Sequence, residues 1–82
     1  MAPADILQYL RKRPFDPFRV QVSDGTTYDV RHPELVMVGL RSISIGVPSP
    51  QQSQPVYEHV ETVSLQHVVK LLPLEGASNA GV

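Results

Sequence analysis

The stretch from Phe18 to Val30 constrains the fold of this chain most strongly. Apolar and polar residues alternate from Phe18 to Ser23, which is the pattern of a β-strand with one face buried. The dipeptide Asp24-Gly25 follows, and it favours a tight hairpin turn because glycine tolerates a positive φ. Thr26 to Val30 then returns as a second strand. A β-hairpin is therefore the first fixed element of the fold.

A short helix is predicted before this hairpin, from Ala4 to Lys12. Ile6, Tyr9 and Leu10 fall at helical spacing and form one apolar stripe. Pro14 then ends the helix, since proline cannot continue it. A helix of this length does not persist alone in water, so we expect it to pack against the strands.

Three further strands are predicted after the hairpin. Ile43 to Val47 alternates with the period of a half-buried strand, and Val56 to Leu65 is the longest strand candidate. The apolar pattern of that long strand changes face in its middle, which predicts a bulge or bend near Val60-Glu61. Gln66-His67 forms a turn before the last strand, Val68 to Leu72.

One more segment, from Leu35 to Leu40, is apolar at every position except Gly39. A strand with a single buried face alternates instead. Either both faces of this segment are covered, or one face meets another subunit.

Composition limits what such a chain can be. Seven Lys and Arg residues against eight Asp and Glu residues give a formal net charge of -1, whereas nucleic-acid modules are usually strongly basic. The chain has no cysteine, so neither a disulfide nor a thiolate-bound zinc ion stabilises its small core. Self-association is the remaining common source of buried area, and Leu35 to Leu40 and Val68 to Leu74 are the candidate surfaces. A homo-oligomer is expected.

The order of these elements resembles the Sm-like barrel. The segment from Phe18 to Gly25 matches its first strand and glycine turn, and His67-Val-Val-Lys-Leu-Leu-Pro73 resembles the end of the bacterial Sm-like RNA chaperones. This resemblance implies a mainly β fold: a small five-stranded antiparallel barrel, Sm-like or SH3-like, with an N-terminal α-helix. It would occupy residues 1–75 as one domain, followed by a disordered C-terminal tail, 76–82.

The chain also resembles a group of short bacterial proteins, through four motifs. These motifs are Arg13-Pro-Phe-Asp-Pro-Phe-Arg19, Asp24-Gly25, Val30-Arg-His-Pro-Glu-Leu35 and Leu65-Gln-His67. This second resemblance implies no activity.

No catalytic site, metal site or cofactor is expected. His32, His59 and His67 are the only histidines, and none has the spacing of a metal-binding motif. His59 and Glu61 share one face of a strand and could hold half of a metal site, but two solvated side chains are the favoured interpretation. No Ser/His/Asp set and no phosphate-binding glycine loop is visible.

Two groups of polar residues are candidates for binding RNA or a partner. Arg31-His32-Pro33-Glu34 could clamp a ligand, although a bend at Pro33 with Arg31 and Glu34 paired across it is the favoured explanation. The basic residues after the helix could meet RNA, or could instead satisfy the helix C-terminus. The candidate contacts are Arg11, Lys12, Arg13, Arg19, Arg31, His32, Arg41 and His67.

The near-neutral charge and the surplus apolar positions favour a non-catalytic binding or scaffold module for protein partners. The alternative is an Sm-like RNA-binding protein that uses a local basic rim. In the Sm-like chaperones a Lys-His pair precedes the last strand, and here that pair is Gln66-His67, so RNA binding ranks second. No stretch approaches the ~20 apolar residues of a membrane span, and a cytoplasmic location is expected.

Overall fold

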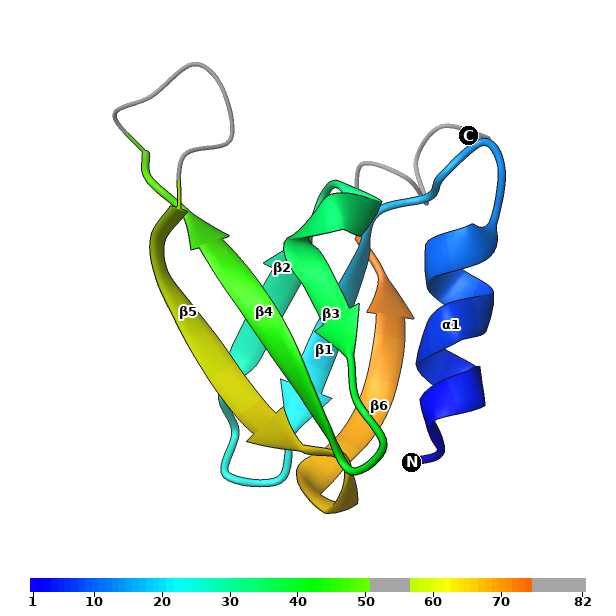
Figure 1. Ribbon diagram of the computed structural model, residues 1–82, viewed down its shortest axis with the longest axis vertical. Coiled ribbons are helices and arrows are strands. Elements are labelled where there is room, and N and C mark those ends of the chain that lie inside the picture. Colours follow the sequence, from blue (N-terminus) through cyan, green and yellow to red (C-terminus); the bar gives the residue numbers. More distant parts are fainter. Residues whose placement is uncertain (51–56, 75–82) are drawn as a thin grey trace.

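Two three-stranded antiparallel sheets make up most of the computed structural model, which describes residues 1–50 and 57–74 (Figure 1). The strand order is β2-β1-β6 in one sheet and β3-β4-β5 in the other. The sheets lie one behind the other, and α1 lies on the side of β6. The predicted class, mainly β with an N-terminal helix, is confirmed.

The first sheet is built around the predicted hairpin. It contains β1 (Phe18–Val22), β2 (Thr27–Val30) and β6 (Val68–Pro73). Gly25 has a φ of +93° in the turn between β1 and β2, a conformation that glycine adopts without strain. Phe18 pairs with Val30 across this hairpin, and both side chains are buried.

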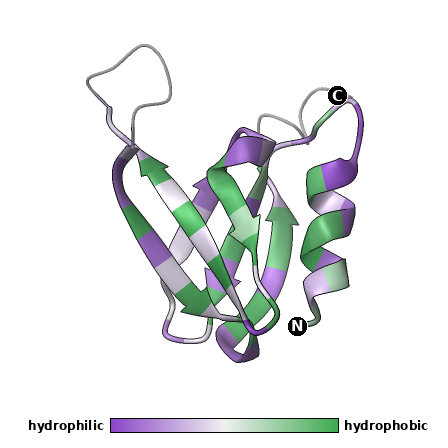
Figure 2. Cartoon of the chain, viewed as in Figure 1, coloured by the Kyte–Doolittle hydropathy of each residue, from purple (hydrophilic) through white to green (hydrophobic). Residues whose placement is uncertain are grey.

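The second sheet consists of β3 (Val36–Val38), β4 (Ser42–Pro48) and β5 (Tyr57–Ser64). Hydrophobic residues alternate along β4 with small residues of intermediate hydropathy, which are green and nearly white in Figure 2. Ile43 and Ile45 point toward the first sheet and are buried, so the two sheets share one core.

The helix α1 (Pro3–Arg11) contributes to this core through its apolar stripe. Ile6 and Leu10 are buried in the same cluster as residues of both sheets, and the Asp5 carboxylate accepts a hydrogen bond from the Ala2 amide. Burial of a side chain of this size contributes about 1.5–3 kcal/mol. Packing on the sheets therefore stabilises a helix that would be too short alone.

The strand count differs from the prediction. The described residues form six strands rather than five, because a 3-10 turn, η1 (Pro33–Leu35), separates β2 from β3. Pro33 begins this turn, where its missing N–H costs nothing. A second 3-10 turn, η2 (Leu65–His67), takes the place of the predicted tight turn before β6.

The predicted bulge near Val60-Glu61 is wrong. The register between β4 and β5 is unbroken there, with Gly46 opposite Val60, and the irregularity lies between Val47 and Pro48 instead. The prediction assumed that every valine of β5 is buried, whereas the Val60 side chain is 57% exposed.

The run from Leu35 to Leu40 has one covered face. Leu35 is buried, but Met37 is 75% exposed and Leu40 is 81% exposed. The predicted tail, 76–82, lies outside the described residues, as does most of the segment from Pro48 to Pro55, which the sequence predicts to be a polar, Pro-rich loop. None of the helices in the described part of the chain has the length and hydropathy that crossing a bilayer requires.

Candidate functional site

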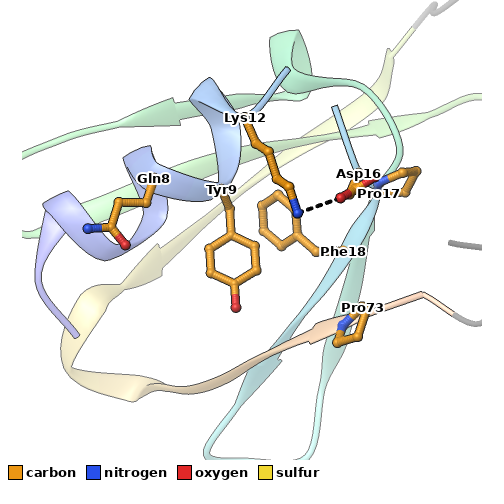
Figure 3. A pocket seen from close by; sticks show the side chains of 7 residues that line it. All are labelled: Gln8, Tyr9, Lys12, Asp16, Pro17, Phe18 and Pro73. Atoms are coloured by element: carbon orange, nitrogen blue, oxygen red, sulfur yellow. Dashed lines mark ion pairs between the residues drawn. The ribbon is translucent and has the colours of Figure 1, made fainter. Parts of the chain in front are cut away.

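A pocket with a volume of about 360 Å3 lies between the C-terminal half of α1 and the first sheet (Figure 3). Its walls are mainly the carbon atoms of aromatic and proline rings, and an ion pair crosses its rim. The lining residues are Gln8, Tyr9 and Lys12 of α1, Asp16, Pro17 and Phe18 of the segment that enters β1, and Pro73 at the end of β6.

Three aromatic rings fix the inner wall of this pocket. The ring centroids of Tyr9 and Phe18 are 5.1 Å apart and tilted by 54°, and those of Phe15 and Phe18 are 6.0 Å apart. These are favourable aromatic geometries. Because Phe18 is buried between the other two, it holds the Tyr9 ring in place, and the outer side of that ring lines the pocket.

The rim of the pocket is electrically neutral. The Lys12 ammonium lies 2.7 Å from the Asp16 carboxylate, four residues along the chain. This hydrogen bond and the carboxylate charge raise the pKa of Lys12 above its usual value. Both side chains are well exposed, so the pair shapes the rim more than it stabilises the fold.

The end of α1 engages a second cation. The Arg13 guanidinium donates to the carbonyl oxygens of Leu10 and Lys12, both at 2.8 Å. These carbonyls belong to the group that a helix C-terminus leaves without intrahelical partners. Arg13 therefore serves the helix end, and a ligand would have to compete with these bonds.

Two further candidate cations lie on the first sheet and share one carboxylate. Arg19 donates from Nε to Asp29 Oδ1 at 2.7 Å, and Arg31 lies 3.8 Å from Asp29 Oδ2. The hydrogen bond from Arg19 is the main reason that the pKa of Asp29 is lowered. The predicted pair between Arg31 and Glu34 is wrong, because Arg31, which directly follows β2, reaches back to Asp29 of that strand.

The remaining candidates lie in turns. His32 precedes η1, and Arg41 lies in the connection between β3 and β4. His67 lies in η2, where its Nδ1 is 3.2 Å from the Ser23 hydroxyl and its carbonyl accepts a hydrogen bond from the Ser23 amide at 2.8 Å. His67 thus ties η2 to the end of β1.

The predicted basic residues do not form one rim. The C-terminal end of α1, which carries Arg11 to Arg13, and the turn with Arg41 lie at opposite ends of the molecule (Figure 1). η2, which contains His67, lies at the same end as Arg41, because the Leu65 amide donates to the Arg41 carbonyl oxygen at 2.9 Å. The structure therefore brings Arg19 and Arg31 together at Asp29, and Arg41 and His67 to one end of the molecule, but it leaves these two groups apart from Arg11, Lys12 and Arg13.

The two side chains of the potential half of a metal site contact each other. His59 Nε2 lies 3.0 Å from Glu61 Oε2 on β5, and both side chains are partly exposed. Within residues 1–50 and 57–74, no group of three or more His, Cys, Asp or Glu side chains gathers.

Sequence reasoning missed most of the pocket. The four-residue spacing of Lys12 and Asp16 is a sequence signal for their ion pair. The prolines on either side of Phe15-Asp16 are a second signal, because they hold the backbone of that segment extended. Nothing in the sequence places Pro73 beside Tyr9, because only the pairing of β6 with β1 brings them together.

The chain was compared with protein-family models, with curated proteins and with solved structures, and none of the three comparisons gave a match. The functional argument therefore rests on the geometry of the pocket and of the exposed surfaces.

Proposed function

We propose that this chain is a non-catalytic binding module that self-associates and that holds an apolar side chain of a protein partner in the pocket beside α1. The pocket carries this proposal. Its volume of about 360 Å3 falls within the range of small-ligand sites, roughly 300–1,000 Å3, and is large enough for one side chain with its flanking backbone.

The chemistry of the walls favours an uncharged, apolar group. Pro17, Pro73 and the ring of Tyr9 offer carbon surface, while the Tyr9 hydroxyl and the Gln8 amide border it with hydrogen-bonding groups for a partner's backbone. Among the described residues that line the pocket, Lys12 is the one cation, and Asp16 neutralises it. A phosphate group would therefore find no net positive charge in the pocket.

We further infer that the two sheets are the halves of an Sm-like barrel. In this interpretation β2 and β3 are one strand interrupted by η1, which gives five strands in the order expected of that fold. The pairing of β1 with both β2 and β6, and the position of α1 before β1, support it. An experimental structure with continuous backbone bonding around the sheets would establish it, and two separate sheets would not.

The binding proposal is tested by a 1H–15N NMR titration with N-acetyl-leucine methylamide and N-acetyl-proline methylamide as probes. We expect concentration-dependent shifts at Gln8, Tyr9 and Lys12, and their loss in Tyr9→Ala. Tyr57→Ala removes another exposed tyrosine and is the matched control, so it should keep the shifts. Shifts that are absent, or that persist in Tyr9→Ala, would contradict the proposal.

RNA binding is separated from this function by a gel-shift assay with short single-stranded RNA over a range of salt concentrations. The dispersed cations predict no retained complex. A complex that weakens steeply with salt, and that Arg11→Ala with Arg13→Ala weakens further, would instead support the RNA-binding alternative.

A further inference from the structure

The C-terminal end of α1, beside the pocket, carries more positive charge than the surrounding fold uses. Arg11, Lys12 and Arg13 follow one another there, and the Asp16 carboxylate pairs with Lys12. Three cations against one carboxylate leave two positive charges among the described residues at this end. The negative end of a helix is equivalent to only about half an elementary charge, so it does not offset them. A surface with a net positive charge therefore adjoins the apolar pocket.

Arg11 is the cation of this group whose side chain has no partner within residues 1–50 and 57–74. Lys12 pairs with Asp16, and the Arg13 guanidinium donates to two carbonyl oxygens at the end of the helix. The Arg11 side chain is exposed, and no carboxylate or carbonyl oxygen of the described chain binds it. Arg11 can therefore bind a negatively charged group without giving up an existing contact.

Arg11 lies next to the pocket along the helix. Gln8 lines the pocket, and Arg11 follows it by three residues, so both side chains leave α1 on the same side. Their Cβ atoms are roughly 5–6 Å apart at this spacing. A second hollow, bordered by Arg11, shares Gln8 and Lys12 with the pocket. Figure 3 shows these two residues on the helical wall, so a ligand seated in the pocket can continue past them toward Arg11.

We propose that the partner segment held by the pocket is acidic: an extended peptide with one apolar side chain in the pocket and a Glu or Asp two residues away that pairs with Arg11. The inference rests on the proposed function and names the chemistry of the partner. In an extended chain, side chains two residues apart project to the same side, about 7 Å from each other. The carboxylate therefore faces the same surface as the apolar side chain, where a guanidinium can bind both of its oxygens.

The composition of the site favours an acidic peptide over RNA. Single-stranded RNA is bound by grooves that combine a row of cations along the backbone with stacked aromatic rings. At this end of the described chain, one unpartnered guanidinium lies beside a pocket of ring carbons. The turn that carries Arg41 lies at the opposite end of the molecule. One carboxylate beside one apolar side chain is the ligand that matches this arrangement.

The ion pair is exposed, so it adjusts the affinity rather than dominating it. Exposed pairs of opposite charge change an equilibrium constant by roughly two- to fivefold. We therefore expect an acidic peptide to bind roughly two- to fivefold more tightly than a neutral peptide of the same length at about 0.01 M salt, where charges interact over about 30 Å. At about 1 M salt this length falls to about 3 Å, and the two affinities should converge.

The test is a 1H–15N NMR titration of the full chain with three peptides: N-acetyl-Glu-Ala-Leu-Ala-Glu-amide, its Gln analogue and its Lys analogue. The symmetric sequence makes the result independent of the direction in which the peptide lies. The dissociation constants come from the amide signals of Gln8, Tyr9 and Lys12, which report on the pocket. We expect the Glu peptide to bind most tightly and the Lys peptide most weakly, and the Arg11 Nε–H signal to shift with the Glu peptide alone.

Charge variants identify the residue responsible. Arg11→Gln should remove the advantage of the Glu peptide over the Gln peptide, and Arg11→Lys, which keeps the charge, should retain most of it. Arg41→Gln removes an exposed cation at the opposite end of the molecule and is the matched control, so it should leave the advantage unchanged. The 1H–15N spectrum shows whether each variant is folded, and the salt series on the wild-type chain tests the same claim without a substitution.

The outcomes separate this inference from the proposed function. If none of the peptides shifts the pocket signals, both are overturned. If the Glu and Gln peptides bind equally well, or if the advantage of the Glu peptide persists in Arg11→Gln, the pocket remains a binding site and the acidic partner is overturned. A short oligouridylate that shifts the same signals at lower concentration than the Glu peptide would assign this surface to RNA and likewise overturn the inference.

Discussion

Replacing Ile6 by alanine should lower the free energy of unfolding of this chain by a large fraction, because Ile6 is the most deeply buried residue of α1 and attaches the helix to the sheets. Its side chain is fully buried in the core cluster. The change removes three carbon atoms, which costs about 2.4 kcal/mol at about 0.8 kcal/mol for each, and the remaining cavity adds to that loss. The expected loss is about 3–4 kcal/mol, within a total of about 4–12 kcal/mol for a domain of this size.

The assay is urea denaturation followed by circular dichroism, with wild type, Ile6→Ala and Gln8→Ala compared at equal concentration. Gln8→Ala changes an exposed position of the same helix and should shift the free energy of unfolding by less than about 0.5 kcal/mol. If Ile6→Ala lowered the free energy of unfolding by less than about 1 kcal/mol, α1 would not be packed as described, and the pocket beside it would lose its wall.

Three further predictions test separate contacts. Gly46→Ala should destabilise the fold by about 1–3 kcal/mol through its clash with Tyr57, and Tyr57→Ala should relieve most of that cost in a double-mutant cycle; additive losses would contradict the contact. Arg13→Ala should cost about 0.5–1.5 kcal/mol in urea denaturation by removing the bonds to the end of α1, and no measurable loss would contradict that role. The pKa of Asp29 is lowered in the folded state, so the stability that Asp29 contributes is present above its unfolded pKa of about 3.9 and is lost as the pH falls through the folded pKa. Asp29→Asn should therefore make the free energy of unfolding depend less steeply on pH in the acid range. An unchanged dependence on pH would count against the pairing of Asp29 with Arg19.

Local pattern was sufficient to predict most elements of this fold. The alternation of β1 and the glycine turn after it identify the first hairpin, and the apolar stripe with Pro14 beyond it identifies α1. Each of these signals depends on residues that are neighbours in the chain. The features that failed depend on which face of a strand is covered, as with Val60, or on which carboxylate a cation reaches, as with Arg31.

The pocket could be predicted even less completely. Lys12 and Asp16 are close in sequence, and their spacing permits the ion pair that the structure contains. Tyr9, Phe18 and Pro73 come from three elements, and only the register of β6 on β1 places them around one cavity. The exposure of Met37 and Leu40 has the same origin, because the sequence from Leu35 to Leu40 shows an excess of apolar residues but does not show which of them remain exposed.

Sedimentation equilibrium of the wild-type chain, from about 1 µM to about 1 mM, tests the central claim most directly, namely that this small module associates with itself. The account predicts an average mass near 9.1 kDa at the lowest concentration that rises toward twice this value at the highest. A mass that stays at 9.1 kDa throughout would contradict it.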